Sequence, residues 1–247
     1  MDRLPATYHV LRDILGNRVE PYESVRLVET YRRYWKPQRV KTLLLAESHV
    51  FTSHADRAIA LPWIPELPAY PTDYAKFVYC LGYGERQLTG DPAHPRRDGT
   101  PQFWKIFFSC VNEVCSNEDF RPVQAITSYR RRLSNKIRLL QQLQSHGIWL
   151  VDTSIVALYD GGKKPTSKLM HDAIIASWDG YISHVIRDCA PEHVIVIGKG
   201  VARSIGANLK ELVGDRYSVI PQPNAHLAAH EHLSNYRRYY QICSGSR

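Results

Sequence analysis

The stretch from Lys41 to Phe51, Lys-Thr-Leu-Leu-Leu-Ala-Glu-Ser-His-Val-Phe, decides the predicted fold. Its apolar run, Thr-Leu-Leu-Leu-Ala, has the length of a strand that is buried on both faces of a parallel sheet. The run ends in Glu47, Ser48 and His49, which carry a carboxylate, a hydroxyl and an imidazole. Open α/β sheets bind ligands at the carboxyl ends of their strands, so this polar end predicts one wall of a site. The alternative is a strand that simply ends in a polar loop.

Later segments alternate between strand-like and helix-like patterns. Apolar runs predict three more buried strands, at Ile148–Asp152, 193–198 and Tyr217–Ile220. Apolar residues at helical spacing predict helices over residues 10–15, 20–35, 103–112, 134–144, 168–188, 201–212 and 233–242. Such alternation is typical of parallel sheets with crossover helices. We therefore expect an α/β fold, a three-layer α/β/α sandwich with a central four-stranded, mostly parallel sheet, and a single domain over residues 1–247.

The composition is that of an ordinary globular protein. Of the 247 residues, 44% are hydrophobic and 23% are charged, which provides enough apolar residues for a sizeable core. The net charge of +8 and the pI of about 9.2 permit a polyanionic partner without demonstrating one. The five cysteines form no C-x-x-C pair, so we expect reduced thiols and a cytoplasmic location. No apolar run approaches the roughly 18 residues of a membrane span, so no membrane association is expected.

Residues 52–101 form a proline- and aromatic-rich insertion after the first strand. Seven prolines interrupt any regular element, and five aromatic residues crowd positions 70–83. Two interpretations remain open. The segment is a cover loop whose rings pack onto the sheet, or one of its rings stacks on a planar ligand.

Residues 121–151 carry six basic residues and no acidic one. Most of the basic residues lie at the start of the helix expected over 134–144. They form either a solvated helix face or a phosphate-binding surface, which needs surplus positive charge but no particular sequence.

Four segments, in chain order, resemble motifs of the uracil-DNA glycosylase superfamily. Residues 43–49 are similar to its first motif, a buried strand and short turn, with Ala46 at the glycine and Glu47 at the Gln or Glu position. Residues 147–158 look like its base-reading strand, with Asp152 at the Asn position.

The two later segments complete the set. Residues 193–202 resemble the family's third strand and glycine turn, and residues 221–230 are similar to its His-Pro-Ser-Pro loop, with Gln222 at the His and Asn224 at the Ser. The resemblance implies a monofunctional DNA glycosylase, a hydrolase that flips and excises a damaged base, most simply uracil, in base excision repair. We expect a monomer whose partner is DNA containing uracil or another deaminated base. No metal or cofactor is expected, because the early C-x-x-C of iron–sulfur members is missing.

Three positions depart from the family pattern. Ser48 stands where the family has a water-activating Asp, and Gln222 stands where it has the His that stabilises the leaving base. Asp152 replaces the amide that reads uracil. An ionised Asp only accepts hydrogen bonds, so either burial keeps Asp152 protonated or the target base presents amino donors.

The reaction needs a carboxylate near the sugar and hydrogen-bond donors near the departing base. Glu47 is the expected carboxylate, because it is the only one in the first motif; the alternative is a strand-end Glu bound to backbone amides. The catalytic candidates are Glu47, Ser48, His49, Gln222, Asn224 and His226. The base-binding candidates are Asp152 and one stacking ring among Phe51, Phe77 and Tyr79. The DNA-binding candidates are Arg130, Arg131, Arg132, Lys163, Lys164 and Lys199 at the phosphates, with Leu227 or His226 as the wedge.

A second hypothesis comes from the same departures. Because both family catalytic positions are substituted, the chain is alternatively a non-catalytic protein of the same fold that binds nucleic acid. A small-molecule hydrolase is less favoured, since the sequence has no Gly-x-Ser-x-Gly nucleophile elbow.

Overall fold

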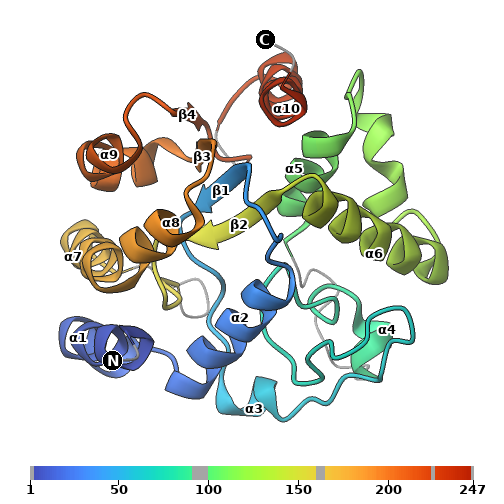
Figure 1. Ribbon diagram of the computed structural model, residues 1–247. Helices are drawn as coiled ribbons and strands as arrows, with labels where there is room; N and C mark the ends of the chain where they lie inside the picture. Colours follow the sequence, from blue (N-terminus) through green and yellow to red (C-terminus); the bar gives the residue numbers. More distant parts are fainter. Residues whose placement is uncertain (1–2, 91–99, 160–164, 224–225, 246–247) are drawn as a thin grey trace.

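A parallel sheet of four strands forms the centre of the computed structural model, which describes residues 3–90, 100–159, 165–223 and 226–245. The strands are β1 (Thr42–Ala46), β2 (Ile148–Asp152), β3 (His193–Ile197) and β4 (Tyr217–Ile220), in the order β2-β1-β3-β4. Every strand pair is parallel, and Ala46 of β1 lies beside Asp152 of β2. All five residues of β1 and of β2 are buried, as an apolar run covered on both faces requires. The predicted α/β fold is confirmed (Figure 1).

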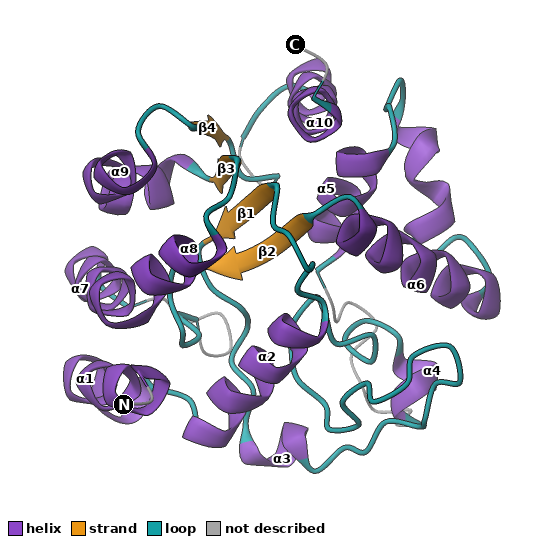
Figure 2. Ribbon diagram, in the orientation of Figure 1, coloured by secondary structure: helices purple, strands orange, loops and turns teal. Residues whose placement is uncertain are grey.

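Helices cover both faces of this sheet (Figure 2). On one side, α6 packs against β2 and α5, and α5 packs against α10. On the other side, α9 packs against β3, β4 and α7, and α1 lies outside α7 (Figure 1). The longer helices are α1 (Arg3–Leu15), α2 (Tyr22–Tyr34), α5 (Pro101–Val111), α6 (Tyr129–Ser145), α7 (Ser167–Ser177), α8 (Ser183–Cys189), α9 (Lys199–Val213) and α10 (Ala229–Ser244).

Several helices are longer than their apolar patterns predict. The first begins at Arg3 rather than at residue 10, because Pro5 lies in its first turn, where a missing N–H costs nothing. The helix expected over 168–188 comprises α7 and α8, joined by a π-helical turn at Trp178–Ile182. That turn brings Gly180 against Thr7 of α1, where a Cβ would collide.

Residues 52–90 of the insertion pack as a cover; the five aromatic rings at positions 70–83 are buried, whereas Trp63 is exposed. It contains two short helices, α3 (His54–Arg57) and α4 (Arg86–Thr89). The hydroxyl of Tyr70 donates to the carbonyl of Tyr79, and the hydroxyl of Tyr79 accepts from the N–H of Leu150 at 2.8 Å. The cover thereby satisfies a backbone donor on β2, an edge strand of the sheet. This arrangement matches the packed cover loop, the first of the two interpretations of the segment.

Candidate functional site

A pocket lies at the carboxyl ends of β1, β3 and β4. Its floor includes Ala46 and Glu47 after β1, Ile197 at the end of β3, and Gln222 after β4. From β1 the chain continues to β2 on one side of the sheet, and from β3 it continues to β4 on the other side. The strand order therefore changes direction between β1 and β3. This switch point is where open α/β sheets bind ligands. The pocket volume of about 270 Å³ suits a small ring rather than a large cofactor.

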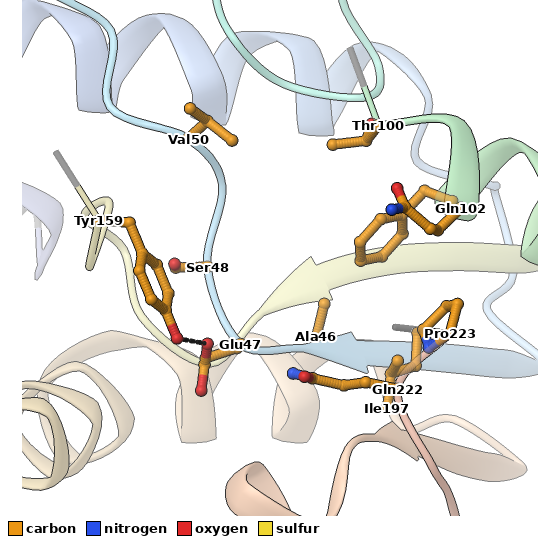
Figure 3. Close-up of a pocket in the computed structure, with 11 residues that line it drawn as sticks. Ala46, Glu47, Ser48, Val50, Thr100, Gln102, Tyr159, Ile197, Gln222 and Pro223 are labelled. Atoms are coloured by element: carbon orange, nitrogen blue, oxygen red, sulfur yellow. Dashed lines mark hydrogen bonds between the residues drawn. The ribbon is translucent and has the colours of Figure 1, made fainter. Parts of the chain in front are cut away.

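Glu47 is the ionisable group at the base of this pocket. The hydroxyl of Tyr159 donates to Oε2 of Glu47 at 2.7 Å (Figure 3). Burial and the adjacent carboxylate raise the pKa of Tyr159 above its usual range, so the phenol remains a donor at neutral pH. Among the described residues, Oε1 of Glu47 has no hydrogen-bond partner, which leaves one carboxylate oxygen for a ligand or water.

The other walls carry amides, a hydroxyl and a ring. Figure 3 shows Val50, Ser48 and Tyr159 on one side of the pocket and Thr100 and Gln102 on the other. Phe103, the next residue of α5, adds an aromatic ring to the lining. Neither Phe103 nor Gln102 was among the expected site residues.

The side chain of Gln222 lies in the space that a side chain on Gly198 would occupy. A Cβ on Gly198 would lie 2.7 Å from Cγ of Gln222, and the φ of +109° at this glycine is one that side chains rarely adopt. The residue before α9 is therefore a glycine for two reasons, backbone conformation and close approach. Because Gly198 has no side chain, there is room for the Gln222 side chain beside it.

Asp152 lies outside the pocket, contrary to its expected role in reading the base. It is 2% exposed, and its Oδ2 accepts from Nη2 of Arg32 at 3.0 Å and lies 3.4 Å from Nδ1 of His49. Arg32 reaches it from α2, beside β2, and also pairs with the buried Glu29. Its carboxylate is directed inward, toward Arg32 and His49 rather than into the pocket, so neither proposed way for Asp152 to read a base fits this arrangement.

His49 is also buried, although it was expected to donate to the departing base. Its Nε2 bonds Oε1 of Glu20 at 2.6 Å, so both ring nitrogens face carboxylates. Burial opposes its charge, but the fields of Glu20 and Asp152 outweigh burial and raise the pKa of His49 to about 9. The side chain is a buried imidazolium between two carboxylates and does not line the pocket.

Ser48 does line the pocket, but it also serves the backbone. Its Oγ accepts from the N–H of Leu158 at 3.3 Å. The hydroxyl thereby links the loop after β1 to the loop after β2.

The three rings expected to stack on a base do not line the pocket. Phe77 is 2% exposed and packs edge-on against His49, with the guanidinium of Arg32 over its face. Tyr79 is equally buried and stacks on Phe107 of α5. Phe51 is half-buried and contributes nothing to the lining. The aromatic residues that do line it are Phe103 and Tyr159.

The expected phosphate contacts differ in exposure. Arg132 is buried because it forms a bidentate pair with Glu85 of the cover, to which Lys136 also binds at 2.7 Å. That pairing leaves Arg132 no donor directed toward DNA and corrects its expected role. The side chains of Arg130, Arg131, Lys199 and His226 are exposed, and that of Leu227 is half-buried. Asn224, Lys163 and Lys164 lie outside the described residues.

Comparisons with protein-family models, with curated proteins and with solved structures found no match. The likeness to the uracil-DNA glycosylase superfamily therefore stays a prediction from the sequence motifs. Within the described parts of the chain, none of the helices combines the length and the apolar character needed to cross a bilayer. The same residues contain no cluster of three or more His, Cys, Asp or Glu side chains arranged to hold a metal ion.

Proposed function

We propose that the pocket hydrolyses the N-glycosidic bond of a base flipped out of DNA, most simply uracil. The single observation that carries the proposal is the Glu47 carboxylate, held by Tyr159 at the base of a small pocket at the switch point of the sheet. A nearby carboxylate stabilises the positive charge that develops on the sugar, and it aligns the attacking water. Its uncommitted Oε1 is the oxygen to which we assign this role.

The opposite side of the pocket supports binding of a planar heterocycle. Phe103 offers an aromatic ring for stacking, and Gln102 and Gln222 offer amides, each of which both donates and accepts hydrogen bonds. An amide N–H also stabilises negative charge on the leaving base, and the same amide can read the base edge, the task that Asp152 cannot perform from its buried position. In this proposal Gln222 both reads the base, as was expected of Asp152, and donates to the leaving base, as was expected of Gln222 itself.

A polyanionic partner agrees with the surplus of basic residues. The chain carries a net charge of +8, and Arg130, Arg131 and Lys199 expose their side chains. Such cations bind phosphates without regard to sequence. All five cysteines are free thiols, which agrees with the proposed cytoplasmic location.

One observation favours the second candidate, a protein of this fold that binds nucleic acid without catalysis. Ser48 occupies the position of the family's water-activating Asp, and its Oγ already accepts the N–H of Leu158. In that case the pocket would hold a base without cleaving its bond.

The two candidates are separated by an excision assay. The full-length protein is incubated with oligonucleotides that carry one uracil, hypoxanthine or xanthine, and abasic sites are then cleaved with alkali. The glycosylase proposal predicts scission at the modified position and none in a matched oligonucleotide of normal bases. Salt-sensitive binding of all these oligonucleotides without scission would contradict it and favour the non-catalytic protein.

A further inference from the structure

Glu20, which belongs to none of the sequence motifs, binds both of the loops that carry Glu47 and Tyr159. It lies between the short helix Gly16–Arg18 and α2, and its side chain is fully buried. Oε1 bonds Nε2 of His49 at 2.6 Å and accepts the N–H of Ala157 at 2.7 Å. Oε2 accepts the N–H of Thr52 at 3.3 Å.

These partners belong to two loops. The first pocket loop, residues 47–53, follows β1 and contains Glu47, His49 and Thr52. The second pocket loop, residues 153–159, follows β2 and contains Ala157 and Tyr159. Glu47 is two residues from His49, and Tyr159 is two residues from Ala157. Both His49 and Ala157 bind Glu20.

The two loops are therefore joined on both sides. On the pocket side, the phenol of Tyr159 donates to Glu47 at 2.7 Å. On the inner side, the Glu20 carboxylate bonds Ala157 of one loop and His49 of the other. Further bonds join the loops on the pocket side; among them, the N–H of Ser154 donates to the carbonyl of Glu47, and the N–H of Leu158 donates to Oγ of Ser48 at 3.3 Å. Neither involves a charged group, whereas Glu20 bonds both loops through a buried carboxylate.

Burial makes the Glu20 bonds obligatory. A carboxylate without water must be paired and hydrogen-bonded, and removal of its partners is strongly destabilising. The buried groups alternate in sign, from Glu20 through His49 and Asp152 to Arg32 and Glu29, so each carboxylate has a cationic neighbour. Loss of the Glu20 carboxylate would remove these bonds from the inner side of both loops.

We propose that Glu20 is a positioning residue, which fixes the spacing of the two pocket loops and thereby the hydrogen bond between Tyr159 and Glu47. The inference rests on the proposed function only in treating Glu47 as the working carboxylate; the effect on the hydrogen bond is independent of catalysis. Glu20 touches no pocket residue that a base would contact, so its influence passes through the loops.

The test observes Tyr159 directly, by NMR of full-length protein labelled with ¹³C at Cζ of tyrosine, at pH 7. The resonance is assigned by its loss in Tyr159→Phe, and Glu47→Ala gives its position when the hydrogen bond is absent. In Glu20→Gln we expect the resonance to move most of the way to the Glu47→Ala position. Where excision is measurable, kcat should fall in Glu20→Gln with little change in KM.

Glu29→Gln is the matched control, because Glu29 is a buried carboxylate of the same charge network that contacts neither loop. Its Tyr159 resonance should stay at the wild-type position.

If Glu20→Gln does not fold, Glu20→Asp keeps the charge opposite His49 but is one methylene too short to reach both loops. A wild-type Tyr159 resonance in a folded Glu20 variant would overturn the proposal, as would failure of both Glu20 variants to fold while Glu29→Gln folds. Absence of excision in the wild type, with the Tyr159 shift present, would count against the proposed function alone.

Discussion

Glu47 and Asp152 stand at the ends of neighbouring strands but occupy opposite environments. Asp152 pairs with Ala46 in the sheet register, so the two carboxylates are one position apart across β1 and β2. Asp152 is 2% exposed and is held between Arg32 and His49. Glu47 is half-buried, and the one side-chain hydrogen bond that it makes among the described residues comes from a phenol.

The difference shows that burial decides which of two similar side chains stabilises the fold and which remains available to a ligand. A fully buried carboxylate must have protein partners, and once it has them it is unavailable to a ligand. Oε1 of Glu47 has no partner in the described parts of the chain, because the pocket leaves this side chain partly open. Asp152 is therefore a structural carboxylate and Glu47 an available one, and this contrast has measurable consequences.

The largest effect should come from Asp152→Ala. It leaves the buried Arg32 and His49 without their shared partner, so the free energy of unfolding should fall by about 3–5 kcal/mol. Urea unfolding measures this change. Asp172→Ala is the control, because its exposed pair with Lys168 should contribute less than about 1 kcal/mol. An equal, small loss in both variants would contradict the structural role of Asp152.

Alkaline pH should weaken the same network through His49. Its pKa in the folded protein, about 9, lies above the ordinary 6.5, so the folded state binds the proton more tightly. The stabilisation is complete below pH 6.5 and is lost as the pH rises through about 9, by roughly 3 kcal/mol at most. Urea midpoints between pH 6 and 10 record the decline, and NMR titration of His49 locates it. A His49 that titrates near 6.5 would contradict the charge assigned to the network.

Gly198→Ala should cost about 1–3 kcal/mol, because it forces a side chain into a conformation reserved for glycine. The new Cβ would also displace the Gln222 side chain from its place beside this residue. Gly206→Ala, in α9 with nothing within 4 Å, is the matched control and should stabilise the protein by up to about 1 kcal/mol. Thermal unfolding of the pair gives both values, and equal melting temperatures would refute the close contact.

Glu47→Gln should have the smallest effect on stability, within about 1 kcal/mol, because the amide oxygen still accepts from Tyr159 and the side chain is partly hydrated. Urea unfolding beside Asp152→Ala tests the contrast directly. A loss comparable to that of Asp152→Ala would show that both carboxylates are structural.

The sheet could be predicted from the sequence because its strands are short, continuous apolar runs. The observed bounds of β2 and β4 are the predicted ones, Ile148–Asp152 and Tyr217–Ile220. Helix starts were missed where polar or proline residues occupy the first turn, as at Arg3 and Tyr129.

The site was predictable at strand ends and unpredictable where a distant side chain intervenes. Glu47 and Gln222 line the pocket because each follows a strand of one parallel sheet. Asp152 follows a strand too, but Arg32 binds it from 120 positions away, and an arginine gives no sequence signal that it will be buried. Tyr159 could have been considered, since it lies in the loop after β2, but unlike Glu47 it does not directly follow its strand. Phe103 carried no such signal.

The central claim is that Glu47 is the available carboxylate and acts on the bond to be cleaved. Its most direct test is the single-turnover rate of uracil excision by Glu47→Gln, with Glu118→Gln, an exposed carboxylate on the surface, as the charge control. The account predicts a rate reduced by roughly 10²–10⁴-fold in Glu47→Gln, with unchanged affinity for the oligonucleotide at fixed salt and a wild-type rate in the control. Excision by Glu47→Gln at the wild-type rate would contradict it.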